Sequence, residues 1–573
     1  MNESGSIKNE TKWSWMWFPA VCVLLVLFKL WLVSAQTVLA VGHASHDDAL
    51  FINLARHILG GRWLGPYNEL TLAKGPMYSL FIAGSFLLGI PLFTAQHLLY
   101  IAACGFLTRA FRLLVPNRWF LLGLFAVLLF NPVTYDASTH SRVLRQDILH
   151  SLVLMILAGL VGLYACREQP KKRLLPWILL LGISLPAFWL TREEGVWLMP
   201  CVILVWAFTA FAIWRQKPAD LTARIALLIV PAVMWLSGLA IVAGLNKAYY
   251  GVFTTCEFRQ SEFKSAFGAM LRTAPKDYPL YLPVTREGRE KLYTISPTFA
   301  KLRAHLEGPT GEAWAGIGEF VTHKPPAERE IAMGWLMWAL RRAVVETGQA
   351  KNAAETMAFY KKMADEINTA CDRGLIPARA KMGGFIPPIE KQQRDAFITV
   401  LPKTAKYFVS FGDITPVTNG GSSGTAEELV WFTDLTRGRL SPGPGVPAIP
   451  RRQARLDQLR VSILSWITDV YAALTPWIVV LGLLTLTASS VLILAKRSFN
   501  FHFLLSLGLI GSNAATIIIV SLIDATSFPA LNTGYFTGGY ALWMLFIFVS
   551  STSLQTVLTK PSLSTIQPLA SKP

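Results

Sequence analysis

The chain has 573 residues, of which 53% are apolar and only 15% are charged, and its mean hydropathy is +0.42. Because about 25% of the residues of a typical soluble protein are charged, this composition excludes a soluble globular protein. It equally excludes disordered, collagen-like and small disulfide-bonded chains. Lys and Arg outnumber Asp and Glu by 53 to 35, a net charge of +18. Basic cytoplasmic loops of a membrane protein account for such an excess, so it predicts membrane lipids, and not nucleic acid, as a partner.

Ten stretches of the chain are apolar enough to be membrane spans, which need roughly 20 mostly apolar residues. In chain order they are 17–40, 94–107, 119–131, 148–166, 174–190, 195–214, 225–245, 472–495, 501–522 and 539–554. The first is too long for the apolar part of a cleavable signal peptide, and no small-residue cleavage site follows it cleanly. We therefore expect it to be a signal anchor.

A further apolar stretch, 77–94, is short and is broken by Gly84, Gly89 and Pro91, and it decides the orientation of everything after it. Clusters of Lys and Arg between spans belong on the cytoplasmic side; they lie at 8–12, 109–118, 167–173, 215–224 and 496–497. If 77–94 crossed the membrane, all the later clusters would lie outside. We therefore predict that 77–94 is re-entrant or lies along the interface, and that the amino terminus is cytoplasmic.

This orientation places three short polar stretches on the extracytoplasmic face, together with the long segment 248–470. The stretches are 46–48, 142–147 and 191–194. Ionisable side chains at the ends of spans cost about 2.5–3.5 kcal/mol each if they slip to the membrane centre, so their gathering on one face indicates a functional site. The alternative is that they are solvated loop ends.

Segment 248–470 has ordinary globular composition and is predicted to be a soluble, mainly helical domain inserted after the seventh span. Apolar residues at helical spacing predict an antiparallel pair of helices at 328–346 and 352–372. Cys256 and Cys371 both fall in this segment, and in an oxidising compartment they are candidates for a disulfide bond.

His46, Asp47 and Asp48 follow the first span and open an amphipathic helix that also carries Arg56. Capping of the helix amino end is the simpler explanation for an Asp at this place. One Asp would suffice for capping, however, and two adjacent acids at the membrane surface favour a role in chemistry.

Basic residues on the same face are suited to binding phosphate. Lys74 precedes the apolar stretch 77–94, where it either extends to the interface as an anchor or holds a phosphate. Arginine matches phosphate oxygens with its planar, forked guanidinium group, and the second and third polar stretches supply Arg142, Arg145 and Arg192. The alternative for these arginines is local pairing with the neighbouring acids, which are Asp147, Glu193 and Glu194.

In their order and spacing, these motifs resemble those of the GT-C fold of integral-membrane glycosyltransferases, particularly protein O-mannosyltransferases and the aminoarabinose transferase of lipid A. Asp47-Asp48, followed by Phe51 and Ala55-Arg56, is similar to the acidic pair and helix of their first outer loop. The Lys74-Gly75-Pro76 sequence resembles their Lys-Pro motif. The stretch 141–147 reads Ser-Arg-Val-Leu-Arg-Gln-Asp and resembles their Ser-Arg-x-x-Arg-Pro-Asp, with Gln146 in place of Pro.

The resemblance implies a GT-C-like helical bundle of about ten spans plus the re-entrant segment. Its parts would be a catalytic transmembrane module at 1–247, the extracytoplasmic domain at 248–470, transmembrane helices at 471–560 and a cytoplasmic tail at 561–573. The protein would be a multi-pass protein of the cytoplasmic (inner) membrane and would act in cell-envelope biogenesis.

The resemblance also implies transfer of a sugar from a polyprenyl-phosphate donor to a glycan, lipid or protein outside the cytoplasmic membrane. Asp47 would act as the general base, with Asp48 beside it. The cations that stabilise the phosphate leaving group would be Lys74, Arg142, Arg145 and Arg192. Supporting residues would be His46, Arg56, Asp147, Glu193 and Glu194. Few ligands for a divalent cation (Mg²⁺ or Mn²⁺) are evident, and the candidates are Asp47, Asp48 and Asp147.

Two other functions are left open by the sequence. A transporter or flippase of lipid-linked glycans would carry charges on both faces and at the membrane centre, whereas Lys29 is the clearest ionisable residue within a span and no inverted repeat is visible. An O-antigen ligase or polymerase also has a large outer loop, but it would not require two acids directly after the first span. No motif specifies the sugar or the acceptor.

Overall fold

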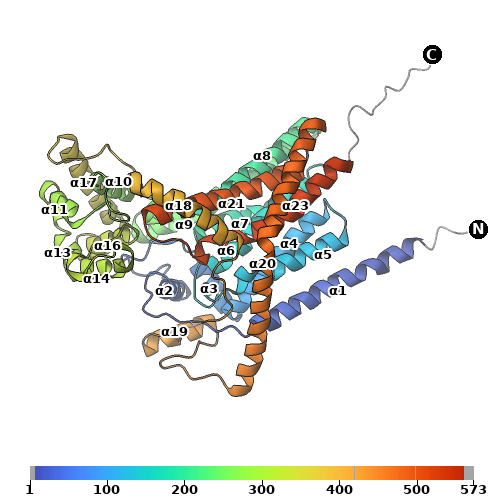
Figure 1. Ribbon diagram of the computed structural model, residues 1–573, viewed down its shortest axis with the longest axis horizontal. Coiled ribbons are helices and arrows are strands. Elements are labelled where there is room, and N and C mark those ends of the chain that lie inside the picture. Colours follow the sequence, from blue (N-terminus) through green and yellow to red (C-terminus); the bar gives the residue numbers. More distant parts are fainter. Residues whose placement is uncertain (1–6, 419, 497–498, 560–573) are drawn as a thin grey trace, which may run out of the picture.

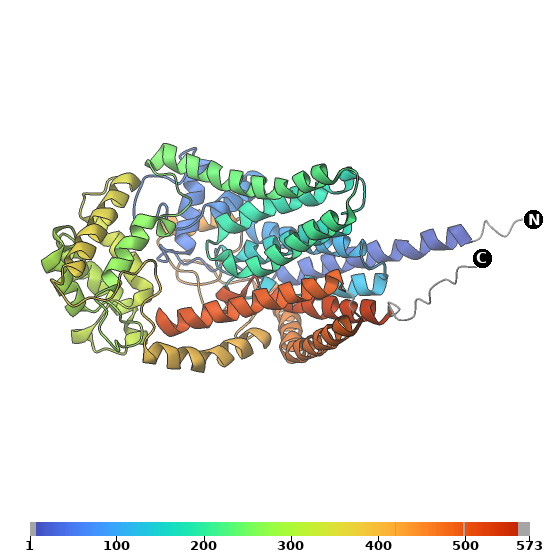
Figure 2. The same ribbon diagram turned by 90° about the horizontal axis from the view of Figure 1, so that it is seen from above.

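The computed structural model describes residues 7–418, 420–496 and 499–559, and these residues are built into helices and connecting loops. Within these ranges no strand forms, and pairing between extended segments is limited to isolated bridges such as that between Val38 and Leu440. Figures 1 and 2 show a bundle of long helices with a group of shorter helices at one end. The prediction of a helical, multi-span fold is confirmed.

Each of the ten predicted spans falls on a helix. These helices are α1 (Ile7–Val33), α4 (Leu92–Arg112), α5 (Arg118–Leu129), α6 (Gln146–Ala165), α7 (Leu175–Thr191), α8 (Met199–Gln216), α9 (Leu221–Tyr250), α20 (Arg451–Lys496), α21 (Phe501–Thr526) and α23 (Tyr540–Thr559). Among the residues described, eight helices are long and apolar enough to cross a membrane, or nine with the bent pair formed by α3 (Met77–Leu87) and α4. The exact number of spans stays a prediction.

Helices α3 and α4 meet at an angle of 108°, within the stretch predicted to turn back. Gly89 between them has a φ of +73°, which costs little only for glycine, and Pro91 cannot donate a helical hydrogen bond. These two residues end α3 and start α4 in a new direction. A re-entrant segment and a broken span share this geometry, so the orientation of the chain in a membrane also stays a prediction.

Helix α6 lies deep in the bundle and is buried on almost every face. Its glycines allow close packing against α7: a Cβ at Gly162 would lie 2.1 Å from the ring of Trp177, and a Cβ at Gly159 would lie 2.8 Å from Leu181. Small residues at such contacts let apolar helices approach closely. The packing places the amino end of α6 next to the carboxyl end of α7. The second polar stretch, 142–147, leads into α6, and the third, 191–194, begins where α7 ends, so the two stretches lie close together.

Helices α10 (Ser261–Leu271) to α17 (Ala353–Asp372) form the group of shorter helices at the end of the bundle in Figures 1 and 2. Their apolar side chains make a separate hydrophobic cluster that runs from Phe263 to Cys371. The two predicted helices are α16 (Met333–Glu346) and α17, but α17 packs chiefly against α10 and only weakly against α16. We call residues 261–372 the outer domain.

The rest of the long segment packs on the bundle. Helix α18 (Lys391–Val409) lies against α21, and α19 (Ala426–Thr436) lies against α2 (Asp48–Leu59) and α3. Phe408 and Phe432 belong to the hydrophobic core of the bundle. The separate core is therefore shorter than the segment 248–470. The tail predicted at 561–573 lies outside the described residues.

The prediction of a possible disulfide bond between Cys256 and Cys371 is wrong, because both thiols are free and buried. The Cys256 thiol lies against the loop before α3 and donates a hydrogen bond to the carbonyl oxygen of Ala73 at 3.2 Å. Cys371 instead packs in the hydrophobic cluster of the outer domain. Burial raises the pKa of both thiols, which keeps them protonated and unreactive at neutral pH.

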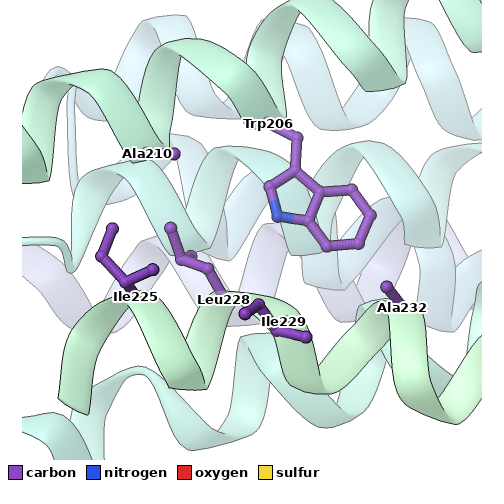
Figure 3. A pocket seen from close by; sticks show the side chains of 6 residues that line it. All are labelled: Trp206, Ala210, Ile225, Leu228, Ile229 and Ala232. Carbon is purple, nitrogen blue, oxygen red and sulfur yellow. The ribbon is translucent and has the colours of Figure 1, made fainter. Parts of the chain in front are cut away.

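An apolar cavity of about 340 Å³ lies between α8 and α9 (Figure 3). Its lining side chains are Trp206, Ala210, Ile225, Leu228, Ile229 and Ala232. Because they come from the middle of α8 and the first part of α9, the cavity is remote from the outer domain, which follows the carboxyl end of α9. A cavity with this lining suits a hydrocarbon chain.

Candidate active site

Asp47 directly precedes α2, yet its side chain makes no capping hydrogen bond to that helix. Its carboxylate instead accepts a hydrogen bond from Lys74, with 2.5 Å between Lys74 Nζ and Asp47 Oδ1. The Asp47 side chain is 51% exposed, whereas the side chain of Lys74 is only 11% exposed. Simple helix capping therefore does not account for Asp47. Its carboxylate is half-exposed at the surface and is paired with a buried lysine.

Lys74 also donates to the carbonyl oxygen of His46 at 2.5 Å, so it ties two consecutive residues of the first loop together. Burial by itself raises the pKa of Asp47. The nearby positive charges of Lys74, Arg142 and Arg145 outweigh this effect and hold that pKa below its ordinary value. Asp47 is thus a carboxylate at neutral pH and is available to accept a proton.

Asp48 has the opposite environment, since it is fully buried at the start of α2. Arg142 forms an ion pair with it and donates from Nε to both carboxylate oxygens at 3.2 Å, while the Val143 backbone N–H donates at 3.1 Å. Burial raises the pKa of Asp48 despite the opposing effect of Arg142. Adjacent acids whose pKa values move apart have different roles: Asp48 anchors the Arg142 loop, and Asp47 faces outward.

Arg145 is held by the third polar stretch. Its Nη1 lies 2.6 Å from Glu193 Oε2 and donates to the carbonyl oxygen of Thr191 at 3.3 Å. The other Glu193 oxygen accepts from the Gly75 backbone N–H at 2.5 Å. A Cβ at Gly75 would lie 2.1 Å from the carbonyl oxygen of Leu190, so glycine is required for the close approach that places Lys74 beside Arg145.

Arg192 connects the third polar stretch to α22 (Thr533–Phe536), a short helix between α21 and α23. Its Nη1 donates to the carbonyl oxygen of Gly534 at 2.9 Å, and its guanidinium group lies 5.0 Å from the centre of the Tyr535 ring. Glu194 accepts from Arg192 Nε at 3.2 Å. Tyr535 was not predicted, because it precedes the last apolar stretch in a short segment with no charged or periodic signal.

The outer domain covers the first loop with aromatic rings. The His46 ring lies edge-on between Trp314 and Trp338, with centres 5.0 and 4.9 Å away, and Trp338 also lies 5.9 Å from Lys74 Nζ. Burial and nearby cations lower the pKa of His46 to about 4, so His46 is neutral at pH 7 and packs against tryptophan. The sequence did not identify Trp314 or Trp338 as site residues.

Two predicted site residues lie apart from this group. Arg56 stacks on the ring of Trp431 in α19, 3.4 Å from its centre. Asp147 is buried at the start of α6, where it lies 3.2 Å from His140 Nδ1 and accepts from Tyr78 at 3.3 Å. Arg56 therefore joins α2 to α19, and Asp147 belongs to a polar layer beneath the site.

The three acids considered as metal ligands do not gather around one point. Asp47 is paired with Lys74, both oxygens of Asp48 bind Arg142, and Asp147 lies in the inner layer. Across the described part of the chain, no group of three or more His, Cys, Asp or Glu side chains is placed to hold a metal ion. These residues do not form a binding site for a divalent cation, and the positive charges of the site are those of its Lys and Arg side chains.

The structure therefore brings the three polar stretches and Lys74 together at the end of the bundle next to the outer domain. Each of the four predicted phosphate-binding cations is paired with a carboxylate. The pairs are Lys74–Asp47, Arg142–Asp48, Arg145–Glu193 and Arg192–Glu194. Such a site can bind an anion through its arginines and accept a proton at Asp47.

No family model matches the chain, and no curated protein matches its sequence. Two solved structures are similar to it. One is ArnT from Cupriavidus metallidurans in the apo state, with 14% identity over 94% of this chain and 78% of that chain and a TM-score of 0.29. The other is the same protein bound to undecaprenyl phosphate, with 13% identity over 93% and 78% of the two chains and a TM-score of 0.29. ArnT belongs to the group of glycosyltransferases that the sequence motifs resemble.

Proposed function

We propose that this protein transfers a sugar from a polyprenyl-phosphate donor to a hydroxyl group of an extracytoplasmic acceptor. The observation that carries the proposal is the pairing of an exposed, ionised Asp47 with the buried Lys74, next to arginines that can hold a phosphate. A general base and an anion site are the two groups that this transfer requires.

Asp47 is the general base of the proposed reaction. The acceptor oxygen attacks the anomeric carbon, its proton passes to Asp47, and the bond between that carbon and the phosphate oxygen breaks, with the electron pair leaving on the phosphate. Asp47 has to approach the acceptor hydroxyl to within about 2.6–3.2 Å. When Asp47 takes up the proton it loses its charge, and Lys74 is then free to turn its charge toward the leaving phosphate.

Arginines stabilise the charge that grows on the phosphate. Arg145 and Arg192 are held by fixed partners, the carbonyl oxygens of Thr191 and Gly534, so their guanidinium groups are oriented before the donor arrives. Preorganised donors of this kind are usually the largest single contribution to such a reaction. We propose no step through a divalent cation, because the acids that would bind it are engaged with Lys, Arg and His.

The lipid part of the donor requires an apolar surface, and the cavity between α8 and α9 offers one. The cavity of Figure 3 begins at Trp206, seven residues into α8, which is about 10 Å along a helix whose rise is 1.5 Å per residue. A flexible prenyl chain whose phosphate lies at the arginines can extend this far. We propose that the cavity receives a distal part of the chain.

The acceptor approaches from the outer domain, which we place outside the cytoplasmic membrane with the amino terminus on the cytoplasmic side. Trp338 lies half-buried above Lys74 and offers an aromatic surface of the kind that lines sites for organic ligands. We propose that it contacts a sugar ring. The acceptor is a glycan, lipid or protein of the cell envelope.

The experiment is a transfer assay with purified protein in liposomes, given a polyprenyl-phosphate sugar that carries a labelled sugar, together with envelope extract as acceptor. We expect the label to appear in a new glycoside and free polyprenyl phosphate to accumulate in equal amount. Movement of intact donor across the bilayer without a new glycosidic bond would instead identify a flippase and refute the proposal.

A further inference from the structure

One carboxylate oxygen of the site bridges two buried arginines. Glu194 Oε2 lies 3.2 Å from Arg192 Nε and 3.7 Å from Arg145 Nη2. The Glu194 side chain is 55% exposed, whereas those of Arg145 and Arg192 are only 12% and 9% exposed. A single negatively charged oxygen at the surface therefore marks a position on which two buried guanidinium groups converge.

The two arginines do not depend on Glu194 for their positions. Arg145 is also bound to Glu193 at 2.6 Å and to the carbonyl oxygen of Thr191, and Arg192 is bound to the carbonyl oxygen of Gly534 and rests on Tyr535. These contacts use other guanidinium nitrogens than the contacts to Glu194. If Glu194 turned into solvent, both cations would stay in place and would have nitrogens free to bind another anion.

The balance of charge favours the departure of one carboxylate when a phosphate enters the site. The four cations of the site are matched by four carboxylates, so an entering phosphate would add unpaired negative charge next to Asp47. Asp48 is buried and Glu193 is held at 2.5–2.6 Å. Glu194 has both high exposure and long contacts, which makes it the acid that can leave most easily.

We propose that Glu194 occupies, in the free protein, the position that the donor phosphate takes when it binds, and that it turns into solvent as the donor enters. This inference rests on the proposed function. Glu194 acts as an internal competitor: it keeps the two arginines paired while the site is empty and gives way to a phosphate, whose several oxygens engage both guanidinium groups better than one carboxylate oxygen does.

Nearby charges keep this competitor ionised. Burial by itself raises the pKa of Glu194, but Arg145 and Arg192 outweigh burial and hold that pKa well below its ordinary value. Competition should therefore persist throughout the pH range in which the enzyme is studied, and only a change of the side chain will remove it.

The test compares Glu194→Gln with Glu193→Gln, two adjacent substitutions that each remove one negative charge. The probe is polyprenyl phosphate without a sugar, added to the full-length protein in detergent, and the measured quantity is its Kd. We expect Glu194→Gln to bind about fivefold more tightly, the factor that loss of an exposed ion pair allows. Glu193→Gln should bind no more tightly, because it loses the partner that fixes Arg145 and Gly75. Glu194→Ala serves as a second variant with the same expected direction.

Unchanged or weaker binding by both Glu194 variants would overturn the inference. The proposed function would survive that result if the wild-type protein still bound the lipid and transferred sugar. Absence of lipid binding by the wild-type protein would overturn both. A titration with inorganic phosphate separates headgroup from lipid recognition: a gain for Glu194→Gln with inorganic phosphate as well places the effect at the arginines, and a gain that needs the prenyl chain contradicts this placement.

Discussion

Lys74 Nζ lies 2.5 Å from Asp47 Oδ1, and this ion pair joins a half-exposed acid at the surface to a buried cation. The lysine comes from the loop before α3 and the aspartate from the loop before α2. The loop before α2 and the loop before α3 thus meet at this ion pair. The hydrogen bonds from Lys74 to the His46 carbonyl oxygen and from the Gly75 N–H to Glu193 hold the two loops in place.

The Asp47–Lys74 pair predicts how activity depends on pH. Because nearby cations lower the pKa of Asp47, the base should stay ionised as pH falls to the ordinary Asp value of about 3.9, and kcat/KM should decline only below it. Lys74→Met removes the nearest positive charge, so the pKa of Asp47 should rise and the acidic decline should move to higher pH. A pH–rate profile of residual activity measures this shift. The same acidic midpoint in both proteins would speak against Asp47 as the titrating base.

Asp48→Asn should lower stability rather than act on chemistry directly. The substitution gives Arg142, whose side chain is 29% exposed, a neutral partner at the buried position of Asp48, and hydrogen bonds to a charged group contribute about 1.5–3 kcal/mol to stability. We expect a clear drop in the unfolding temperature of the detergent-solubilised protein. Asp434→Asn, at an exposed position on α19, is the matched control and should unfold like the wild type. Equal unfolding temperatures for all three proteins would show that Asp48 does not anchor the loop.

Gly75→Ala should reduce activity by displacing Lys74. The new Cβ would lie 2.1 Å from the carbonyl oxygen of Leu190, so the backbone has to shift, and a misplacement of about 1 Å can lower a rate by roughly 10²-fold. Gly84→Ala is the control, because no atom lies within 4 Å of a Cβ placed there. Initial rates of sugar transfer measure both variants. Wild-type rates for Gly75→Ala would mean that the close approach is not needed.

Much of the fold follows from the sequence because membrane helices reveal themselves by apolar length alone. Each of the ten predicted stretches falls on a helix, and the acids and arginines were identified because they gather at the ends of spans on one predicted face. Contacts between distant segments leave no such local signal. Tyr535 reaches Arg192, and Trp338 reaches His46 and Lys74, across more than 250 residues of sequence.

Closeness in the sequence also does not show whether two side chains are close in space. Cys256 and Cys371 share a segment but belong to different environments, one against the loop of Ala73 and the other in the outer domain. Similarly, Arg56 follows the acidic pair by a short interval, yet two helical turns carry it to Trp431 on α19.

Trp338→Ala should raise the KM of the sugar-bearing substrate roughly tenfold, the factor that corresponds to about 1.4 kcal/mol of lost contact energy. Trp338→Phe should keep a KM close to that of the wild type, because it retains an aromatic ring. Trp335→Ala is the control, because Trp335 lies on the same helix but contacts Phe320 and Phe528. Steady-state kinetics at varied donor and acceptor concentrations will show which KM changes. Equal losses for Trp335→Ala and Trp338→Ala would indicate a general effect on the outer domain.

The most direct measurement is single-turnover sugar transfer by Asp47→Asn, made together with the Kd of that variant for polyprenyl phosphate. General-base catalysis contributes typically 10²–10⁴-fold, so the rate should fall by about this factor, while lipid binding stays close to that of the wild type because the arginines are untouched. An Asp47→Asn variant that transfers sugar at the wild-type rate would contradict the assignment of Asp47 as the base, and with it the mechanism proposed for this site.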